Sequence, residues 1–216
     1  MANSSRNTRA TLIALGSLFV ALGVALGIAL EADTHLLEFD ANWSQWILTI
    51  RGPVGDAVAF TFDALGGGII GIVVVPVLIA IVLLARRRYR TLIVYVGASL
   101  LSGLVVQVMK HVFARERPEH MIVTSDFGSF PSGHTANAAT AAAVLVFFVP
   151  RAWTTVVAVA YVLLMAICRT YVGAHWFSDT VGGALVGVGV ALLFFAIPVP
   201  IANAPARAPG RNTVGA

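Results

Sequence analysis

The chain has 216 residues, of which 58% are hydrophobic and only 11% are charged, and its mean hydropathy is +0.88. A soluble domain carries about a quarter of charged residues, so this composition excludes that class and indicates a membrane protein. The formal net charge of +4 is modest, and nothing in it predicts a nucleic-acid partner.

Stretches almost free of charge recur along the chain, and each approaches the roughly 20 residues that cross a bilayer core. We therefore predict an all-α integral membrane protein with six transmembrane helices in one bundle, formed by residues 1–198. The predicted spans are Thr11–Leu30, Leu65–Ala85, Leu92–Met109, Thr135–Val149, Trp153–Ile167 and Trp176–Val199. The fourth and fifth are short as written and must extend into their flanks.

The first span follows Arg6 and Arg9, a pattern that also precedes the core of a signal peptide. Its apolar stretch exceeds the roughly 7–15 residues of such a core. We therefore expect an uncleaved membrane anchor.

Between the first two spans, apolar residues recur at helical spacing, which predicts a short interfacial helix. These residues are Leu36, Phe39, Trp43, Trp46, Ile47 and Ile50. Two interpretations remain open for the Leu36–Ile50 segment: it packs against the bundle, or it guides a lipid toward a site.

Glycines punctuate the predicted spans. Gly66–Gly68 is expected to break the chain before the second span, and Pro76 to kink that span. The pairs Gly23/Gly27 and Gly183/Gly187 have a small-xxx-small spacing, which more often marks close helix packing than dimerisation. Oligomeric state stays open.

Basic residues set the expected orientation, because short cytoplasmic loops collect Lys and Arg. Arg6, Arg9, the stretch ARRRYR after the second span, Arg151 and the tail arginines alternate so that both termini fall in the cytoplasm. All 10 acidic residues and all five histidines then fall at the outer side. The Ala- and Pro-rich residues 199–216 are expected to form a disordered cytoplasmic tail.

The stretch KHVFARERP, after the third span, then places Lys110, Arg115 and Arg117 on the side where positive charge is not expected. An anion bound at the outer surface would explain Lys110 and Arg117. Arg51 and Arg115 are interpreted as cations that snorkel to the interface. Glu116 and Glu119 are interpreted as solvated loop charges.

The stretch PSGH before the fourth span is typical of an anion-binding helix start. Ser132 can cap the helix, while Gly133 lets the backbone approach a ligand closely. Free amides and the positive end of the helix dipole favour a negative ligand there. His134 lies in the first turn, although a capped helix with an incidental histidine would give the same four letters.

His175 and Asp179 are four residues apart, so on a helix their side chains would share a face. A carboxylate that accepts one imidazole N–H leaves the other nitrogen free to attack phosphorus. Cleavage of a phosphoester without a metal needs a second group, such as His134, to protonate the leaving oxygen. Arg169, with Lys110 and Arg117, would neutralise the phosphoryl oxygens.

A zinc site is the rival interpretation of a His/Asp cluster. Zinc takes three or four close ligands, whereas only His175 and Asp179 form a close pair in the sequence, and their expected neighbours are cations. Cations repel a metal and attract phosphate, so we predict no metal and no cofactor.

The sequence resembles the type 2 phosphatidic acid phosphatase family. The family pattern Lys-x6-Arg-Pro, Pro-Ser-Gly-His and Ser-Arg-x5-His-x3-Asp is present in order as KHVFARERP, PSGH and CRTYVGAHWFSD, within residues 110–179. The resemblance implies a metal-independent lipid phosphatase. One departure is visible, because Cys168 stands where the third motif usually has serine.

The resemblance also implies a role for each matching position. His175 is expected to become the phosphohistidine, with Asp179 as its orienting partner and His134 as the acid for the leaving group. Lys110, Arg117 and Arg169 are expected to form a phosphate clamp, with further hydrogen bonds from Ser132 and Gly133.

The expected partner is a phosphorylated membrane lipid at the outer face of the cell membrane. Undecaprenyl diphosphate is the leading candidate, and phosphatidic acid and phosphatidylglycerol phosphate are the alternatives that the resemblance implies. Two other classes remain open. Vanadate-dependent haloperoxidases are similar in fold and pocket but resemble soluble proteins, and a non-enzymatic lipid transporter or scaffold could keep such a site.

Overall fold

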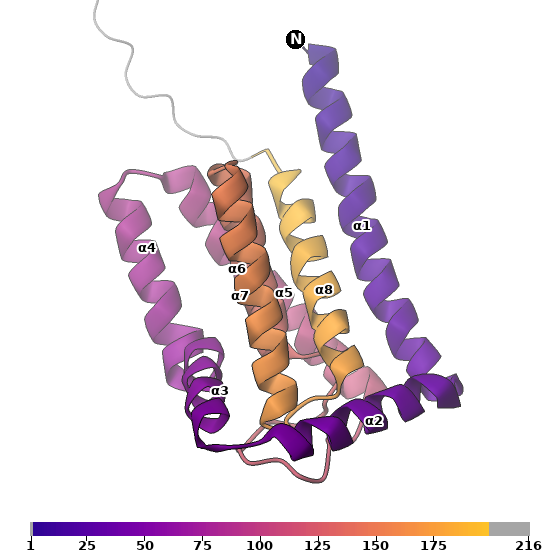
Figure 1. Cartoon of the computed structure of the whole chain (residues 1–216). Helices are drawn as coiled ribbons and strands as arrows, with labels where there is room; N and C mark the ends of the chain where they lie inside the picture. Colours follow the sequence, from indigo (N-terminus) through magenta and orange to yellow (C-terminus); the bar gives the residue numbers. More distant parts are fainter. Residues whose placement is uncertain (1, 199–216) are drawn as a thin grey trace, which may run out of the picture.

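The computed structural model of the chain describes residues 2–198, and within this range it is built of helices and loops without a strand (Figure 1). The elements in chain order are α1 (Ala2–Ala32), α2 (Thr34–Ile50), α3 (Pro53–Gly66), the π-helical turn η1 (Ile70–Val74), α4 (Val75–Ala85), α5 (Tyr89–Phe113), α6 (Gly133–Phe148), α7 (Ala152–Tyr171) and α8 (Phe177–Phe195). The predicted tail, residues 199–216, lies outside the described residues.

Every predicted span overlaps a helix, and the all-α prediction is confirmed for the described residues. Four helices, α1, α5, α7 and α8, are long and apolar enough to cross a membrane, or five spans result if a bent pair counts as one. The first part of that pair is α3, and the second is η1 together with α4. The second part is bent by 49° from the direction of the first. The count of six spans stays a prediction, because α6 has only 16 residues.

The bend between α3 and α4 lies at the predicted glycine break, Gly66–Gly68. Gly68 has a φ of +56°, in the left-handed region that glycine adopts without strain. Pro76 does not lie at this bend: it is in the first turn of α4, directly after the π-helical turn η1, whereas the bend is between Gly66 and Ile70. The apolar helix α3 ahead of the break was not predicted.

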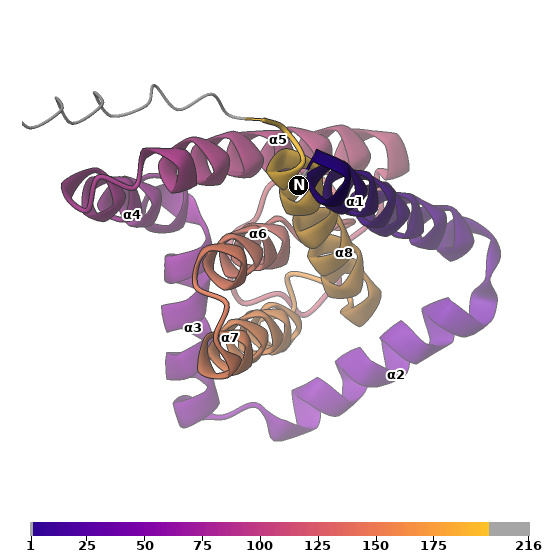
Figure 2. The ribbon, with the colours of Figure 1, turned by 90° about the horizontal axis from the view of Figure 1, so that it is seen from above.

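The short helix α6 is surrounded by other helices over most of its length. Figure 2 shows it between α5, α7, α8 and α3, and its residues from Thr135 to Val144 are largely buried. At about 1.5 Å per residue it is about 24 Å long, less than the roughly 30 Å of a bilayer core. Because protein covers its sides, α6 does not have to match the thickness of the bilayer.

Glycines bring α8 against α6, as their spacing predicted. A Cβ on Gly183 would lie 2.4 Å from the carbonyl oxygen of Ser132, and one on Gly187 would lie 2.3 Å from that of Ala136. Thr140 Oγ1 adds a hydrogen bond across this contact to the carbonyl of Gly187. The second glycine pair faces neighbours within the same chain too, since Gly23 lies against Val186 of α8.

The bundle has two chemically different ends. The N-terminal end of α1, the turn between α4 and α5, and the link between α6 and α7 lie at the top of Figure 1, where they gather Arg6, Arg86–Arg88 and Arg151. The opposite end holds the α5–α6 loop and the α7–α8 turn, and α2 lies across it. Asp33 caps α2 by accepting from the amide of His35 at 2.9 Å.

Candidate active site

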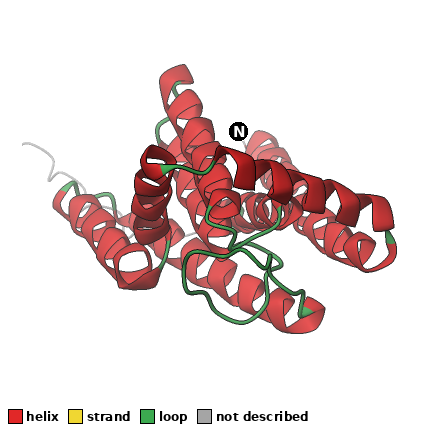
Figure 3. Ribbon diagram, turned by 60° about the horizontal axis from the view of Figure 1, so that its bottom comes forward, coloured by secondary structure: helices red, strands yellow, loops and turns green. Residues whose placement is uncertain are grey.

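Two loops at the end of the bundle near α2 carry Arg117, Ser132 and His175 of the predicted site (Figure 3). The long loop, residues 114–132, connects α5 to α6, and the short turn, residues 172–176, connects α7 to α8. The ends of α5, α6, α7 and α8 supply the rest. The three motifs are therefore brought together, as the sequence predicted.

Lys110 and Arg117 bind the same atoms of the long loop. Lys110 Nζ lies 2.9 Å from Asp126 Oδ1 and 2.8 Å from the carbonyl oxygen of Gly128, while Arg117 Nη2 lies 2.8 Å and 2.7 Å from these two oxygens. Burial alone would raise the pKa of Asp126, but the hydrogen bond and the charge of Lys110 outweigh it, so this pKa is lowered. The Asp126 carboxylate is thus an anion held by both cations.

Two glycines give the loops their shape. Gly128, with a φ of +70°, aims its carbonyl at Lys110 and Arg117, and Gly173, with a φ of +71°, precedes Ala174, whose carbonyl accepts from Arg117 Nη1. A side chain at either position would require a backbone conformation that L residues rarely adopt.

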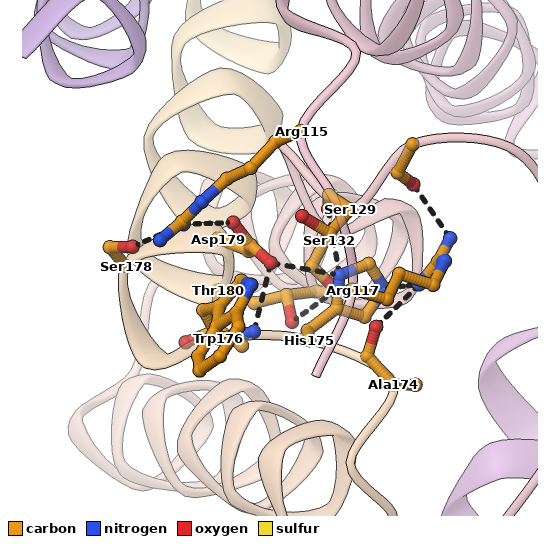
Figure 4. Close-up of polar contacts among 12 residues, drawn as sticks. Arg115, Arg117, Ser129, Ser132, Ala174, His175, Trp176, Ser178, Asp179 and Thr180 are labelled. Carbon is orange, nitrogen blue, oxygen red and sulfur yellow. Dashed lines mark hydrogen bonds and ion pairs between the residues drawn. The ribbon is translucent and has the colours of Figure 1, made fainter. Parts of the chain in front are cut away.

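The His175 ring is held by a backbone carbonyl. Its Nδ1 lies 2.8 Å from the carbonyl oxygen of Ser129 and 3.5 Å from Asp179 Oδ2, while its Nε2 lies 3.4 Å from Arg117 Nη1 (Figure 4). A carbonyl only accepts, so the neutral ring carries its hydrogen on Nδ1 and has its lone pair on Nε2. Nε2 is the nitrogen that can act as a nucleophile.

His175 is uncharged at neutral pH. Burial lowers its pKa well below the ordinary value of 6.5, and the positive charges of Arg169, Arg117 and Lys110 lower this pKa further. These three cations are the residues that were predicted to form the phosphate clamp, and their charges act on the imidazole. They also keep the ring in the form that has a free lone pair.

The prediction that His175 and Asp179 lie on one helix is wrong, because His175 lies in the turn before α8. Asp179 accepts from the amide of Trp176 at 2.9 Å and so caps α8. The two side chains still approach each other, but the closer partner of the ring is Ser129, a residue that the sequence did not single out.

Arg115 is not an interfacial cation, contrary to the prediction. Its guanidinium lies between two buried carboxylates: Nη1 is 2.6 Å from Asp179 Oδ1 (Figure 4), and Nη2 is 2.8 Å from Asp40 Oδ2. It also donates to Ser178 Oγ at 2.8 Å. The snorkelling interpretation failed because Asp40, 75 residues earlier in the chain, supplies the partner.

The same correction applies to Arg51. Its Nε donates to the carbonyl of Tyr171 at 3.0 Å and its Nη1 to that of His120 at 2.9 Å. Arg51 therefore ties the segment after α2 to the α7–α8 turn and to the long loop.

Ser132 caps α6, as predicted. Its Oγ accepts from the amide of Thr135 at 3.5 Å and from Thr135 Oγ1 at 3.2 Å, and its own amide donates to the carbonyl of Asp179 at 2.9 Å. The Ser132 side chain is buried, whereas Gly133 is partly exposed and has space beside it. Of the two, Gly133 is the freer to meet a ligand with its backbone.

His134 and Arg169 share a carboxylate from α3. His134 Nε2 lies 3.4 Å from Asp63 Oδ1 and 3.1 Å from the Asp63 carbonyl oxygen, and Arg169 Nη1 forms an ion pair with the same Oδ1. Arg169 is 1% exposed, and its Nε is buried without a hydrogen-bond partner among the described residues. Such a group can still donate to a ligand.

Two predictions about carboxylates and metals can be compared with the structure. Glu116 and Glu119 are exposed, as expected for solvated loop charges. Among the described residues, no group of three or more His, Cys, Asp or Glu side chains lies close enough to hold a metal ion. Cys168 is buried and forms no disulfide.

Asp40, Asp63 and Asp126 were missed as site residues. A signal for Asp40 exists, because it lies on the apolar face of α2 that Leu36 and Ile47 define, and it is 1% exposed. A carboxylate on an apolar face needs a cationic partner. Asp63 lies in the similarly apolar α3, whereas Asp126, in a polar loop, gives no such signal.

Comparisons with known proteins agree with this arrangement. A family model described as the PAP2 superfamily matches residues 91–201. The chain is 29% identical over 122 residues to an undecaprenyl-diphosphatase of Sulfolobus acidocaldarius, an alignment that covers 53% of this chain and 58% of that protein. It is 31% identical over 126 residues to a lipid A 1-phosphatase of Rhizobium johnstonii, covering 50% and 51% respectively. The chain thus spans about half the length of these relatives.

One solved structure is similar over nearly the whole bundle. It is the crystal structure of a transmembrane PAP2 type phosphatidylglycerolphosphate phosphatase from Bacillus subtilis, with a TM-score of 0.73. The match covers 84% of this chain and 93% of that one, at 23% identity. At this identity, the likeness shows the fold.

Replacing Arg115 by Gln is expected to lower the free energy of unfolding by about 3 kcal/mol, because it leaves Asp40 and Asp179 buried without their cation. Unfolding of the purified protein in mixed micelles measures this change. Arg90→Gln is the matched control, since Arg90 is exposed at the other end of α5. Equal stability of the two variants would contradict a structural role for the Arg115 ion pairs.

Proposed function

The chain belongs to the PAP2 superfamily, and from this premise we propose that it is a membrane lipid phosphatase. The observation that carries the proposal is the His175 site, where a neutral imidazole with Nε2 free lies among Arg117, Lys110 and Arg169. Buried cations attract a phosphoryl group, and a nucleophile within the same cluster can attack it.

In the first step, His175 Nε2 attacks phosphorus and forms a P–N bond while the P–O bond to the lipid breaks. The bonding electrons pass to the lipid oxygen, which receives a proton from His134; His134 begins the step as the imidazolium, beside the Asp63 carboxylate. The Nδ1–H bond to the Ser129 carbonyl keeps the ring oriented and stabilises the charge that develops on it. With a diphosphate substrate, the leaving group is the lipid monophosphate.

In the second step, water attacks the phosphorus of the phosphohistidine and gives a proton to His134. The P–N bond breaks, its electrons return to Nε2, and inorganic phosphate leaves. His134 thus serves first as acid and then as base, and the enzyme returns to its starting form without a metal or cofactor.

The phosphoryl oxygens are proposed to bind Lys110, Arg117 and Arg169, with further hydrogen bonds from Ser132 and Gly133. The unpartnered Nε of Arg169 supports this assignment, because a phosphate oxygen would satisfy it. Asp179 holds the start of α8, through the Trp176 amide, and lies beside the nucleophile that it is proposed to orient.

We propose six spans, with α3 and α4 as one bent span and α6 as the central one, and we place α2 at the membrane interface. The arginine-rich end would face the cytoplasm, together with both termini, by the positive-inside rule. The site would then open on the extracytoplasmic side of the cell membrane. This arrangement is supported by the separation of the two ends in Figure 1.

Undecaprenyl diphosphate is the substrate that we propose. The similarity to an undecaprenyl-diphosphatase and the proposed outward-facing site support this choice. The similarity to a lipid A 1-phosphatase makes other phosphorylated lipids the natural comparison substrates. A transporter or scaffold would move lipid without releasing phosphate.

The purified protein is expected to release phosphate from undecaprenyl diphosphate in excess chelator, and faster than from phosphatidic acid. His175→Ala is expected to abolish release, because it removes the nucleophile. The measurement is free phosphate over time, for both lipids and both proteins. Release that stops on chelation, or that survives His175→Ala, would contradict the proposed mechanism.

His134→Ala is expected to slow turnover by a factor on the order of 10²–10⁴ for an alkyl phosphate, whose leaving oxygen needs a proton. For p-nitrophenyl phosphate the loss should be much smaller, because nitrophenolate leaves without protonation. The kcat values of the variant and the wild type on both esters give the comparison. Equal losses on the two esters would count against His134 as the acid.

A cysteine placed at Glu119 should react in intact cells with a maleimide that cannot cross membranes, whereas one placed at Arg87 should react only after permeabilisation. Both positions are exposed and lie at opposite ends of the bundle. Cys168→Ser provides the background without other cysteines. The reverse labelling pattern would show that the proposed orientation is wrong.

A further inference from the structure

An apolar groove runs between α7 and α8 and ends beside the candidate active site. Its volume is about 230 Å³. Leucine, isoleucine, valine and alanine side chains line its length, with Trp43 of α2 and Phe177 of α8 also part of the wall. None of the residues assigned above to catalysis or phosphate binding lines it.

The inner end of the groove adjoins the site through three threonines. Thr135, Thr170 and Thr180 line the groove, and each directly follows a site residue, namely His134, Arg169 and Asp179. From Thr170, the wall continues along α7 to Val162, about 12 Å farther along the helix at 1.5 Å per residue. The groove therefore leads from the phosphate-binding end into the apolar middle of the bundle.

The outer side of the groove is open. Leu163 and Ile167 of α7 and Val181 of α8 line it and are exposed by 58%, 48% and 38%. In the membrane arrangement proposed above, these apolar side chains face lipid. A hydrocarbon chain can then enter sideways from the bilayer without crossing water.

Helix α2 covers the end of the groove near the site. The rings of Trp43 and Phe177 have centroids 4.9 Å apart, and Phe39 packs on Phe177 at 5.4 Å. The hydroxyls of the three threonines already donate within the protein, whereas Trp43 Nε1 is buried without a hydrogen-bond partner among the described residues. Trp43 Nε1 can therefore donate to an oxygen near a lipid head group. One turn earlier, Asp40 fixes α2 to Arg115.

We propose that this groove binds the first part of one hydrocarbon chain of the phosphorylated lipid while its phosphate lies at His175. The inference rests on the proposed phosphatase function and deepens it. A groove of about 230 Å³ between two helices has room for part of a single chain, so a polyprenyl or alkyl phosphate fits it directly. A lipid with two chains leaves the second chain in the bilayer.

The groove predicts a dependence on chain length. Each buried methylene strengthens binding by roughly fourfold. For wild-type protein, kcat/KM for alkyl phosphates should rise from butyl toward dodecyl phosphate and then level off, once the chain extends beyond Val162. A rise that continues without a plateau, in step with partition of the substrate into the micelle, would contradict binding in a groove that ends near Val162.

Filling the groove tests its role directly. Ala184→Phe is expected to lower kcat/KM for dodecyl phosphate by about tenfold or more, because the ring occupies the space of the chain. It should change kcat/KM for p-nitrophenyl phosphate, which has no chain, by less than about twofold. Ala166→Phe, on the opposite wall, is a second variant in case the first does not fold.

Ala160→Phe is the matched control, since Ala160 is an exposed alanine of α7 outside the groove. It should leave both substrates unchanged. Equal losses on both substrates in the groove variants, or no loss for dodecyl phosphate in either, would overturn the proposal.

A binding measurement separates this proposal from the phosphatase function. Dodecyl phosphate with a diazirine at the chain end should label the part of the groove far from the site, around Val162–Ala166 of α7 and Ala184 of α8, and excess dodecyl phosphate should compete while dodecanol should not. If wild-type protein hydrolyses no phosphate ester, the phosphatase function fails and the labelling pattern alone decides on the groove. Equal competition by dodecanol would show that bulk lipid fills it, which would overturn the proposal.

Discussion

The burial of positive charge at one end of a membrane protein is the constraint on which the rest of this structure depends. An unpaired ion taken out of water costs several kcal/mol, so each buried cation needs an anion in contact. The structure supplies them from four different elements: Asp40 from α2, Asp63 from α3, Asp126 from the long loop and Asp179 from α8. The positions of α2 and α3 across the end of the bundle follow from these pairings.

Close contact between the backbones of α6 and α8 fixes where the site residues at the starts of these two helices lie. Because Gly183 and Gly187 carry no side chain, α8 lies against the backbone of α6. The amide of Ser132 then reaches the carbonyl of Asp179, so the start of α6 and the start of α8 are joined by a hydrogen bond. Two motifs separated by more than 40 residues thus form one rigid unit.

Much of this could be predicted from sequence, because it depends on local pattern. The lengths of the apolar stretches predicted helices, the glycine spacing predicted close helix contacts, and the stretch PSGH predicted the cap of α6. The carboxylate partners of Arg115 and Arg169 depend on how distant elements pack, and a sequence carries no direct record of that. The tautomer of His175 could not be predicted either, because the backbone carbonyl of Ser129 sets it. Every residue has such a carbonyl, so the sequence does not show which one contacts the ring.

The double contact of Asp126 with Lys110 and Arg117 would have a kinetic consequence for the proposed phosphatase. These cations stay neutralised between turnovers, so the loop does not have to rearrange around bare charge when phosphate departs. In the proposed phosphatase, product release would be an anion exchange in which the Asp126 carboxylate takes the place of the departing phosphate. An intramolecular competitor of this kind would limit product inhibition, because it is present at a fixed local concentration however much free phosphate accumulates.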